Sequence, residues 1–274
     1  MTRPDKRLNS ADIPAAKSST LCEAETIRVA SALVDDRIAL FFQPIVRANS
    51  NNLVAFYEGL ARIKMPSGQI ISAGQFMPFV ENTPLGIEVD RRVLQLGLIS
   101  LDNNPDIRLS INISVSTMSD PVWLEILNGA PLNACERLII EITEHAAMST
   151  VDHTSAFMHH VRKKGCGIAM DDFGAGATSF RYFKDFLFDF VKIDGLFIRD
   201  LAYDKGNQVL VKALINISKH YDIVTVAEFV ETSGEAGMAT KLGVDCLQGY
   251  LIGEPTPSPV ALKCETYENR KIAG

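Results

Sequence analysis

Residues 167–174 read Gly-Ile-Ala-Met-Asp-Asp-Phe-Gly, an apolar run that ends in two adjacent carboxylates. The run predicts a short buried strand. Asp171 and Asp172 leave this strand pointing to different sides, because alternate residues of a strand face opposite ways. Two acids at the end of a buried strand are costly unless a cation meets them. Taken alone, the pair fits a turn or a helix cap equally well.

The same pattern recurs along the chain. Helix-like segments, for example 154–164, 207–220 and 235–242, separate most of the apolar runs, which favours an α/β fold. About eight such units in roughly 250 residues fit a (β/α)8 TIM barrel, whose functional groups lie at the carboxyl ends of the strands. A doubly wound sheet is the alternative, but the glycine-rich turn G-x-G-x-x-G that normally opens it is absent. The polar residues that end the other runs are Gln43, Glu58, Asn112, Glu141, Lys192 with Asp194, Glu228 and Gln248.

Composition indicates one globular domain. The 274 residues are 47% hydrophobic and 22% charged, close to the average for soluble proteins. We expect a disordered tail over 1–22, a barrel domain over 23–262 and a C-terminal extension over 263–274. The tail lacks the apolar core of a secretory signal. No stretch approaches about 18 consecutive apolar residues, so we expect no membrane span.

Charge and cysteine content narrow the possible partners. The net charge of −6 argues against binding to DNA or RNA duplexes, which needs a basic face. The five cysteines are scattered and form no C-x-x-C pair, so we expect no zinc site. Reduced thiols in a cytoplasmic protein are the simpler interpretation.

A barrel would gather five carboxylates and one amide at one mouth. Like charges in one cavity repel, so protons or cations must be present. An oxygen-only ligand set suits Mg²⁺ or Mn²⁺ and not zinc or copper. Two such ions can activate a water and stabilise an in-line displacement at phosphorus, and Lys192 beside them can orient that water. The six residues are Glu58, Asn112, Glu141, Asp171, Asp172 and Glu228.

Each of these positions also has an ordinary structural interpretation. The acids could form surface ion pairs or cap helix N-termini, and the asparagine could close a turn. It is much less probable that all of these interpretations hold at successive strand ends. The alternatives are a Glu58–Arg62 salt bridge, a turn at Asn112, helix caps at Glu141 and Glu144, a solvated Lys192–Asp194 pair, and a helix N-terminus at Glu228 and Glu231.

Ordered sequence blocks between about residues 30 and 258 resemble the EAL domain family. The resemblance implies a bacterial phosphodiesterase that opens cyclic di-GMP to linear pGpG on a modified (β/α)8 barrel with one antiparallel strand. It also implies a homodimer, with a regulatory protein partner as a further possibility. The blocks are Gln43-Pro44-Ile45, Glu58-Gly59-Leu60, Asn112-Ile113-Ser114, Glu141-Ile142-Thr143-Glu144, Asp171-Asp172-Phe173-Gly174, Val191-Lys192-Ile193-Asp194, Ala227-Glu228, Val230-Glu231-Thr232 and Gln248-Gly249-Tyr250.

The resemblance also implies roles for individual residues. The six residues named above match the ligands of two Mg²⁺ or Mn²⁺ ions, with Asp171 between the ions. Lys192 matches the residue that contacts the attacking water. Glu228 matches both a ligand and a general base. The remaining matches are Glu231 and Gln248 in the catalytic group, Glu144 as the residue that holds the loop after the fifth barrel strand, and Gln43, Arg62 and Asp194 as substrate contacts.

The sequence departs from the family pattern in four places. Gly59 replaces an alanine, residues 173–179 lack the usual Thr and Tyr, Phe229 replaces a glycine, and Glu254 replaces a basic residue. A glycine at 229 could adopt positive φ, which phenylalanine adopts only at a cost. The departures leave every matched ligand in place. They keep open a second hypothesis, a weak or inactive cyclic di-GMP receptor that signals to a protein partner.

Overall fold

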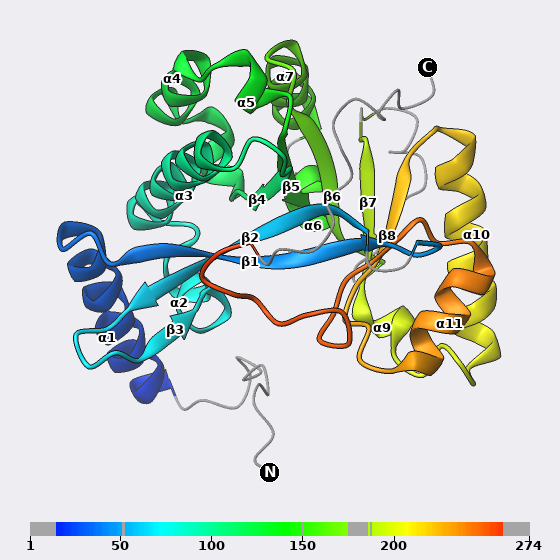
Figure 1. Ribbon diagram of the computed structural model, residues 1–274. Coiled ribbons are helices and arrows are strands. Elements are labelled where there is room, and N and C mark those ends of the chain that lie inside the picture. Colours follow the sequence, from blue (N-terminus) through cyan, green and yellow to red (C-terminus); the bar gives the residue numbers. More distant parts are fainter. Residues whose placement is uncertain (1–14, 51–52, 150, 175–185, 187, 260–274) are drawn as a thin grey trace.

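The computed structural model describes residues 15–50, 53–149, 151–174, 186 and 188–259 (Figure 1). Within these residues, eight strands close into a barrel, in the order β1-β9-β8-β7-β6-β5-β4-β2, and β1 pairs with β2 to complete the ring. A ninth strand, β3 (Ile70–Ser72), extends β2 outside the ring. The ring strands are β1 (Ile38–Arg47), β2 (Val54–Lys64), β4 (Leu109–Asn112), β5 (Leu138–Thr143), β6 (Gly167–Phe173), β7 (Phe190–Ile193), β8 (Val224–Ala227) and β9 (Cys246–Leu247).

One strand of the ring runs against the others. β1 is antiparallel to both of its neighbours, β2 and β9. The six other pairings around the ring, from β2–β4 to β8–β9, are parallel. The predicted barrel with one antiparallel strand is therefore confirmed. The carboxyl ends of the seven parallel strands consequently meet at one end of the barrel.

Helices cover the outside of the barrel. In Figure 1, α3 to α5 and α7 lie on one side of the strands, and α10 and α11 on the other. None of the helices in the described part of the chain is long and apolar enough to cross a bilayer. The elements outside the sheet are α1 (Ala15–Val34), α2 (Ala73–Val80), α3 (Pro84–Asn103), the 3-10 helix η2 (Val115–Ser119), α4 (Pro121–Gly129), α5 (Leu132–Cys135), α6 (Glu144–Ser149), α7 (Val151–Lys163), α9 (Gly195–Ile198), α10 (Lys205–His220) and α11 (Ser233–Leu242).

Capping residues set helix boundaries that differ from those expected. The Asp204 side chain accepts from the backbone N–H of Asn207 at 3.0 Å, so α10 begins before the predicted segment 207–220. Thr232 and Glu235 form a capping box that starts α11. At the other end of the chain, α1 begins at Ala15, inside the segment 1–22 that we expected to be disordered.

An apolar layer inside the barrel lies beneath the mouth. Its buried members include Phe56, Ile139, Ala169, Phe190, Val226 and Cys246, one from each of β2, β5, β6, β7, β8 and β9. The residue two positions further along each strand faces the same side, one step nearer the mouth. The residues at those positions are Glu58, Glu141, Asp171, Lys192, Glu228 and Gln248. The alternation of the strands thus places a polar layer directly on an apolar floor.

Candidate active site

Four carboxylates surround the ammonium group of Lys192 at the mouth of the barrel. Lys192 Nζ lies 2.8 Å from Glu141 Oε2 and 3.2 Å from Glu58 Oε2. It also lies 3.0 Å from both Asp171 Oδ1 and Glu228 Oε1. The lysine side chain is only 1% exposed. Residues from four strands and from the position just after β8, up to 170 positions apart in sequence (228 − 58), therefore meet at one buried cation.

The burial of this cluster shifts its protonation equilibria. Burial raises the pKa of Glu141 to about 8, although Lys192 acts in the opposite direction. Burial likewise raises the pKa of Glu228 well above its ordinary range. For Lys192, burial disfavours the charged form, but attraction to the surrounding carboxylates outweighs it and raises the pKa of the ammonium group. One lysine therefore does not neutralise all of the acids around it.

Glu58 is the acid of the cluster with the most donors. Besides Lys192, it accepts hydrogen bonds from Asn112 Nδ2, at 2.8 Å, and from Gln248 Nε2. Burial alone would raise its pKa, but Lys192 and these two amides together lower it. Gln248 Nε2 also donates to Gln43 Oε1 at 3.2 Å. Two of the predicted residues outside the acid set, Gln43 and Gln248, thus join the same hydrogen-bond network.

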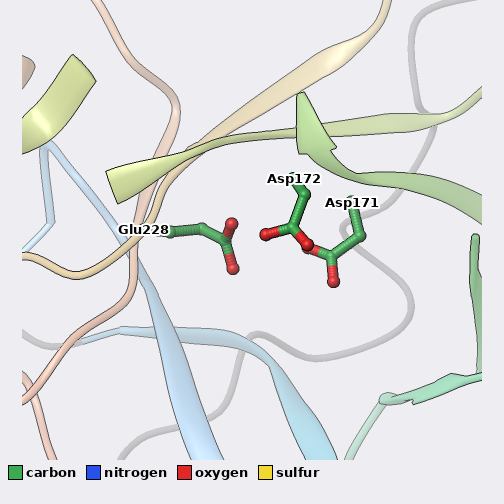
Figure 2. A group of neighbouring side chains, drawn as sticks. All are labelled: Asp171, Asp172 and Glu228. Carbon is green, nitrogen blue, oxygen red and sulfur yellow. The ribbon is translucent and has the colours of Figure 1, made fainter. Parts of the chain in front are cut away.

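Asp172 completes an acidic group that could hold a metal ion. Figure 2 shows the carboxylates of Asp171, Asp172 and Glu228 turned toward one another, and one ligand oxygen from each lies within 4.8 Å of the others. Asp172 adopts a φ of +53°, which is unusual for a residue with a β-carbon. This backbone bend lies within the last residues of β6, where the pairing with β7 shifts register.

The donor set fits a hard divalent cation. Three buried acceptor oxygens, Glu141 Oε1, Glu228 Oε2 and Gln248 Oε1, have no hydrogen-bond partner among the described residues. Buried acceptors are normally paired, so unsatisfied oxygens that share a site with surplus carboxylates call for a further positive charge. Oxygen ligands of this kind suit Mg²⁺ or Mn²⁺. The cluster therefore has the composition of a metal centre.

Glu144 links two strand ends. It is the first residue of α6, directly after β5, and its Oε2 accepts from the backbone N–H of Gly174 at 2.9 Å. Gly174 is the last described residue after β6, and the segment 175–185 that follows lies outside the described residues. The contact joins the start of α6 to the end of β6, and the function of Glu144 in holding the loop stays a prediction. Most of the departure at 173–179 falls in the undescribed segment.

The contacts that the structure shows for three other predicted residues are local ones. Arg62 is four residues beyond Glu58 on β2, and its Nη1 donates to Ala61 O at 2.9 Å. Asp194 caps α9 by accepting from the Leu196 N–H at 2.7 Å. Glu231 is exposed in the turn before α11. Whether these residues contact a substrate stays a prediction.

Two departures from the family pattern have visible consequences. A β-carbon at Gly59 would lie 3.2 Å from Leu109 Cδ1 and from Ser110 O, so the alanine of the family signature would be tight here. Phe229 has a φ of +53°, the conformation in which a glycine would be unstrained. The expected backbone cost at 229 is therefore present, directly after Glu228. The sequence pattern identified Gly59 and Phe229 as departures. It did not reveal that Lys192 lies at the centre of the four carboxylates.

In metal-free protein, we expect the free energy of unfolding to fall as the pH rises from about 5 to about 8. The pKa of Glu141 is raised to about 8, and that of Glu228 is raised too. A carboxyl whose pKa is higher in the folded state stabilises the fold below its unfolded pKa. That contribution is lost as the pH passes through the folded pKa. Urea unfolding in EDTA at about pH 5.5 and 8.5 should show a loss of roughly 2–4 kcal/mol.

The matched control for this prediction is Glu141→Gln, which removes one of the titrating groups and keeps its shape. This variant should lose less stability over the same pH interval. The pKa of Glu58 is shifted the other way, to below its ordinary value of 4.5. Glu58 therefore changes stability only at a pH below the interval that is measured. Equal stability of the wild-type protein at both pH values would contradict the prediction.

Comparisons with known proteins agree with this geometry. The family model described as the EAL domain matches residues 26–255. The chain is 31% identical over 253 residues to the cyclic di-GMP phosphodiesterase PdeB of Shewanella oneidensis, covering 89% of this chain and 29% of that protein. It is also 31% identical to the bifunctional diguanylate cyclase/cyclic di-GMP phosphodiesterase MucR of Pseudomonas aeruginosa, covering 83% of this chain and 34% of that protein. The chain thus spans about a third of the length of these relatives.

Solved structures show the same fold. A structure described as the PaMucR phosphodiesterase in complex with c-di-GMP superposes with a TM-score of 0.77 at 30% identity, covering 85% of this chain and 98% of that one. The FimX EAL domain from Pseudomonas aeruginosa, bound to c-di-GMP, gives 0.78 at 25% identity, with coverages of 85% and 97%. The family model covers most of the chain, so this chain belongs to the EAL domain family.

Proposed function

We propose that this protein is a metal-dependent phosphodiesterase that hydrolyses cyclic di-GMP to linear pGpG. The observation that carries the proposal is the buried cluster of four carboxylates around Lys192, with acceptor oxygens left unsatisfied beside it. The relatives named as cyclic di-GMP phosphodiesterases support the choice of substrate.

The proposal assigns a task to each group at the mouth. Glu58, Asn112, Glu141, Asp171, Asp172 and Glu228 would hold two Mg²⁺ or Mn²⁺ ions. When bound, such ions supply an activated water and charge stabilisation at phosphorus. Lys192 would orient the water and offset negative charge at the reacting phosphate. Glu228, besides holding metal, would be the general base that takes up the proton of the water.

Substrate contacts would surround this centre. Gln43 joins the network of Glu58 through Gln248, and this contact supports a place for it next to the reacting phosphate. Arg62 presents a planar fork of donors that suits a phosphate oxygen pair. Asp194 lies one residue beyond the end of β7 and would face the other edge of the ligand.

The second candidate is a cyclic di-GMP receptor that binds without turnover. The strained Phe229 beside Glu228 favours it, because a displaced Glu228 would weaken catalysis more than binding. Purified protein incubated with cyclic di-GMP and Mn²⁺ separates the two candidates. Formation of pGpG that stops in EDTA supports the phosphodiesterase. Tight binding by calorimetry with no product at high enzyme concentration supports the receptor.

Glu144→Ala should weaken metal-dependent turnover, although the residue is not among the proposed ligands. Loss of the hydrogen bond to Gly174 frees the loop after Asp172, so we expect kcat to fall roughly 10–100-fold. The Mn²⁺ concentration needed for half-maximal rate should rise. Glu144→Gln can still accept from Gly174 and is the control. Unchanged kinetics in the alanine variant would remove this coupling.

Several features of the assembly stay predictions. These are the homodimer, a regulatory protein partner and a cytoplasmic location. We also propose the domain division at 22 and 262, with the helical residues from Ala15 onward extending into the N-terminal segment.

A further inference from the structure

An exposed aromatic ring lies at the rim of the mouth, next to a buried acid. Phe229 is 48% exposed, whereas Glu228 before it is buried. The backbone of Phe229 also occupies the left-handed region, at a φ of +53°. The strained backbone is unfavourable for stability, and a half-exposed ring gains less from burial than a core ring does. Core packing does not offset the backbone strain at Phe229. The reason for a phenylalanine at this position therefore lies outside the core.

The ring of Phe229 packs against the backbone of Gly195. A β-carbon built on Gly195 would lie 2.7 Å from Phe229 Cδ2 and 2.9 Å from its Cβ, so the ring lies against the bare backbone of Gly195. Gly195 is the first residue of α9, directly after Asp194, which caps that helix. One side of the ring is therefore supported, while about half of the residue remains open to solvent. This arrangement presents a flat apolar surface between the ends of β7 and β8.

The neighbouring strand end repeats the same order of polar and apolar residues. The buried Gln248 after β9 is followed by Tyr250 and Leu251, which are both exposed. The two segments are joined, because Val230 N–H donates to Gln248 O at 3.0 Å and Leu251 N–H donates to Val230 O at 3.1 Å. The mouth thus has charged groups inside and apolar groups on this part of its rim. A ligand with an anionic centre and flat apolar ends matches that distribution.

We propose that Phe229 is a stacking surface for one purine base of the dinucleotide whose phosphate lies at the acidic cluster. The inference rests on the proposed function and names a residue of this chain that binds the substrate. A cyclic dinucleotide carries its two phosphates in a central ring and its bases outside that ring, so a base bound beside Glu228 reaches the rim. Aromatic side chains stack on bases through their π-faces.

The test compares three substitutions at this position. Phe229→Gly removes the ring and the backbone strain together, Phe229→Ala removes the ring and keeps the strain, and Phe229→Trp keeps a ring. The affinity for cyclic di-GMP is measured by calorimetry in Ca²⁺, a hard cation that takes oxygen ligands, after a check that no pGpG forms under these conditions. Mn²⁺ affinity, kcat and KM are measured separately. The control is Leu196→Ala, which changes an exposed apolar residue on the neighbouring helix α9.

We expect roughly 10-fold weaker binding of cyclic di-GMP for both the Gly and Ala variants. KM should rise to match, with Mn²⁺ affinity and kcat unchanged, and Phe229→Trp and Leu196→Ala should bind like wild type. A ring that only supports Glu228 would instead change Mn²⁺ affinity and kcat. If wild type cleaves cyclic di-GMP and Phe229→Gly binds it equally well, the stacking role alone is wrong. If wild type neither binds nor cleaves it, the proposed function fails.

Discussion

Asp171→Ala should abolish turnover of cyclic di-GMP while leaving the fold almost as stable as before. Loss of the carboxylate between the two proposed metal sites removes several kcal/mol of transition-state stabilisation, which corresponds to a rate decrease of roughly 10³-fold or more. The free energy of unfolding should change little, because Lys192 keeps three other carboxylates within 3.2 Å. The charge of Asp171 also raises the pKa values of Glu141 and Glu228, so its removal relieves repulsion.

The measurements for this prediction are product formation in Mn²⁺ and urea unfolding at about pH 8. Glu58→Ala should give the same loss of turnover, whereas its effect on stability should be less favourable. Glu58 accepts from Asn112, Lys192 and Gln248, and those donors would lose their partner. Asp171→Asn preserves shape without charge and serves as the control. Full activity in Asp171→Ala would show that the site is misassigned.

Lys192→Met should produce the largest loss of stability in metal-free protein, together with loss of turnover. Methionine is similar in length but leaves Glu58, Glu141, Asp171 and Glu228 at the mouth without their shared cation. Removing one partner of a buried ion pair costs about 3–5 kcal/mol. Because the acids can escape the repulsion by binding protons, the loss should be larger at about pH 8 than at about pH 6.

Divalent ions give this prediction a second readout. If the cluster fits a hard cation, Mn²⁺ should raise the unfolding temperature of Lys192→Met more than that of wild type, since no ammonium charge competes for the same oxygens. The double variant Lys192→Met/Glu141→Gln should be more stable than Lys192→Met alone, because it carries one buried charge fewer. Equal stability of wild type and Lys192→Met in EDTA would show that the ion pairs contribute nothing.

The barrel itself was predictable because its signal is local and repeated. Each parallel strand is a short apolar run, and the residue where polarity returns falls at the mouth, as Glu58, Glu141 and Glu228 show. Once the fold class is known, these residues must converge, since parallel strands end on the same side. The antiparallel β1 came from the family resemblance, because its sequence pattern is that of any buried strand.

Other features depended on distances that no local pattern encodes. Lys192 was expected beside the acids, yet it lies among them, because it faces inward two residues beyond Phe190 on β7. Glu231 carries the same chemical group as Glu228 but is exposed in the turn before α11. The start of α1 at Ala15 was missed because residues 15–20 are polar enough to resemble a tail.

The sequence alone therefore determined the barrel, the family and the identity of the acids at the mouth. These follow from the order of apolar and polar residues along each strand. Only the tertiary structure decided which charges share Lys192, why Glu141 and Glu58 have opposite pKa shifts, and where the ring of Phe229 lies. The physical reason is that electrostatic energies depend on separation and burial, and strand closure sets both for residues far apart in the chain.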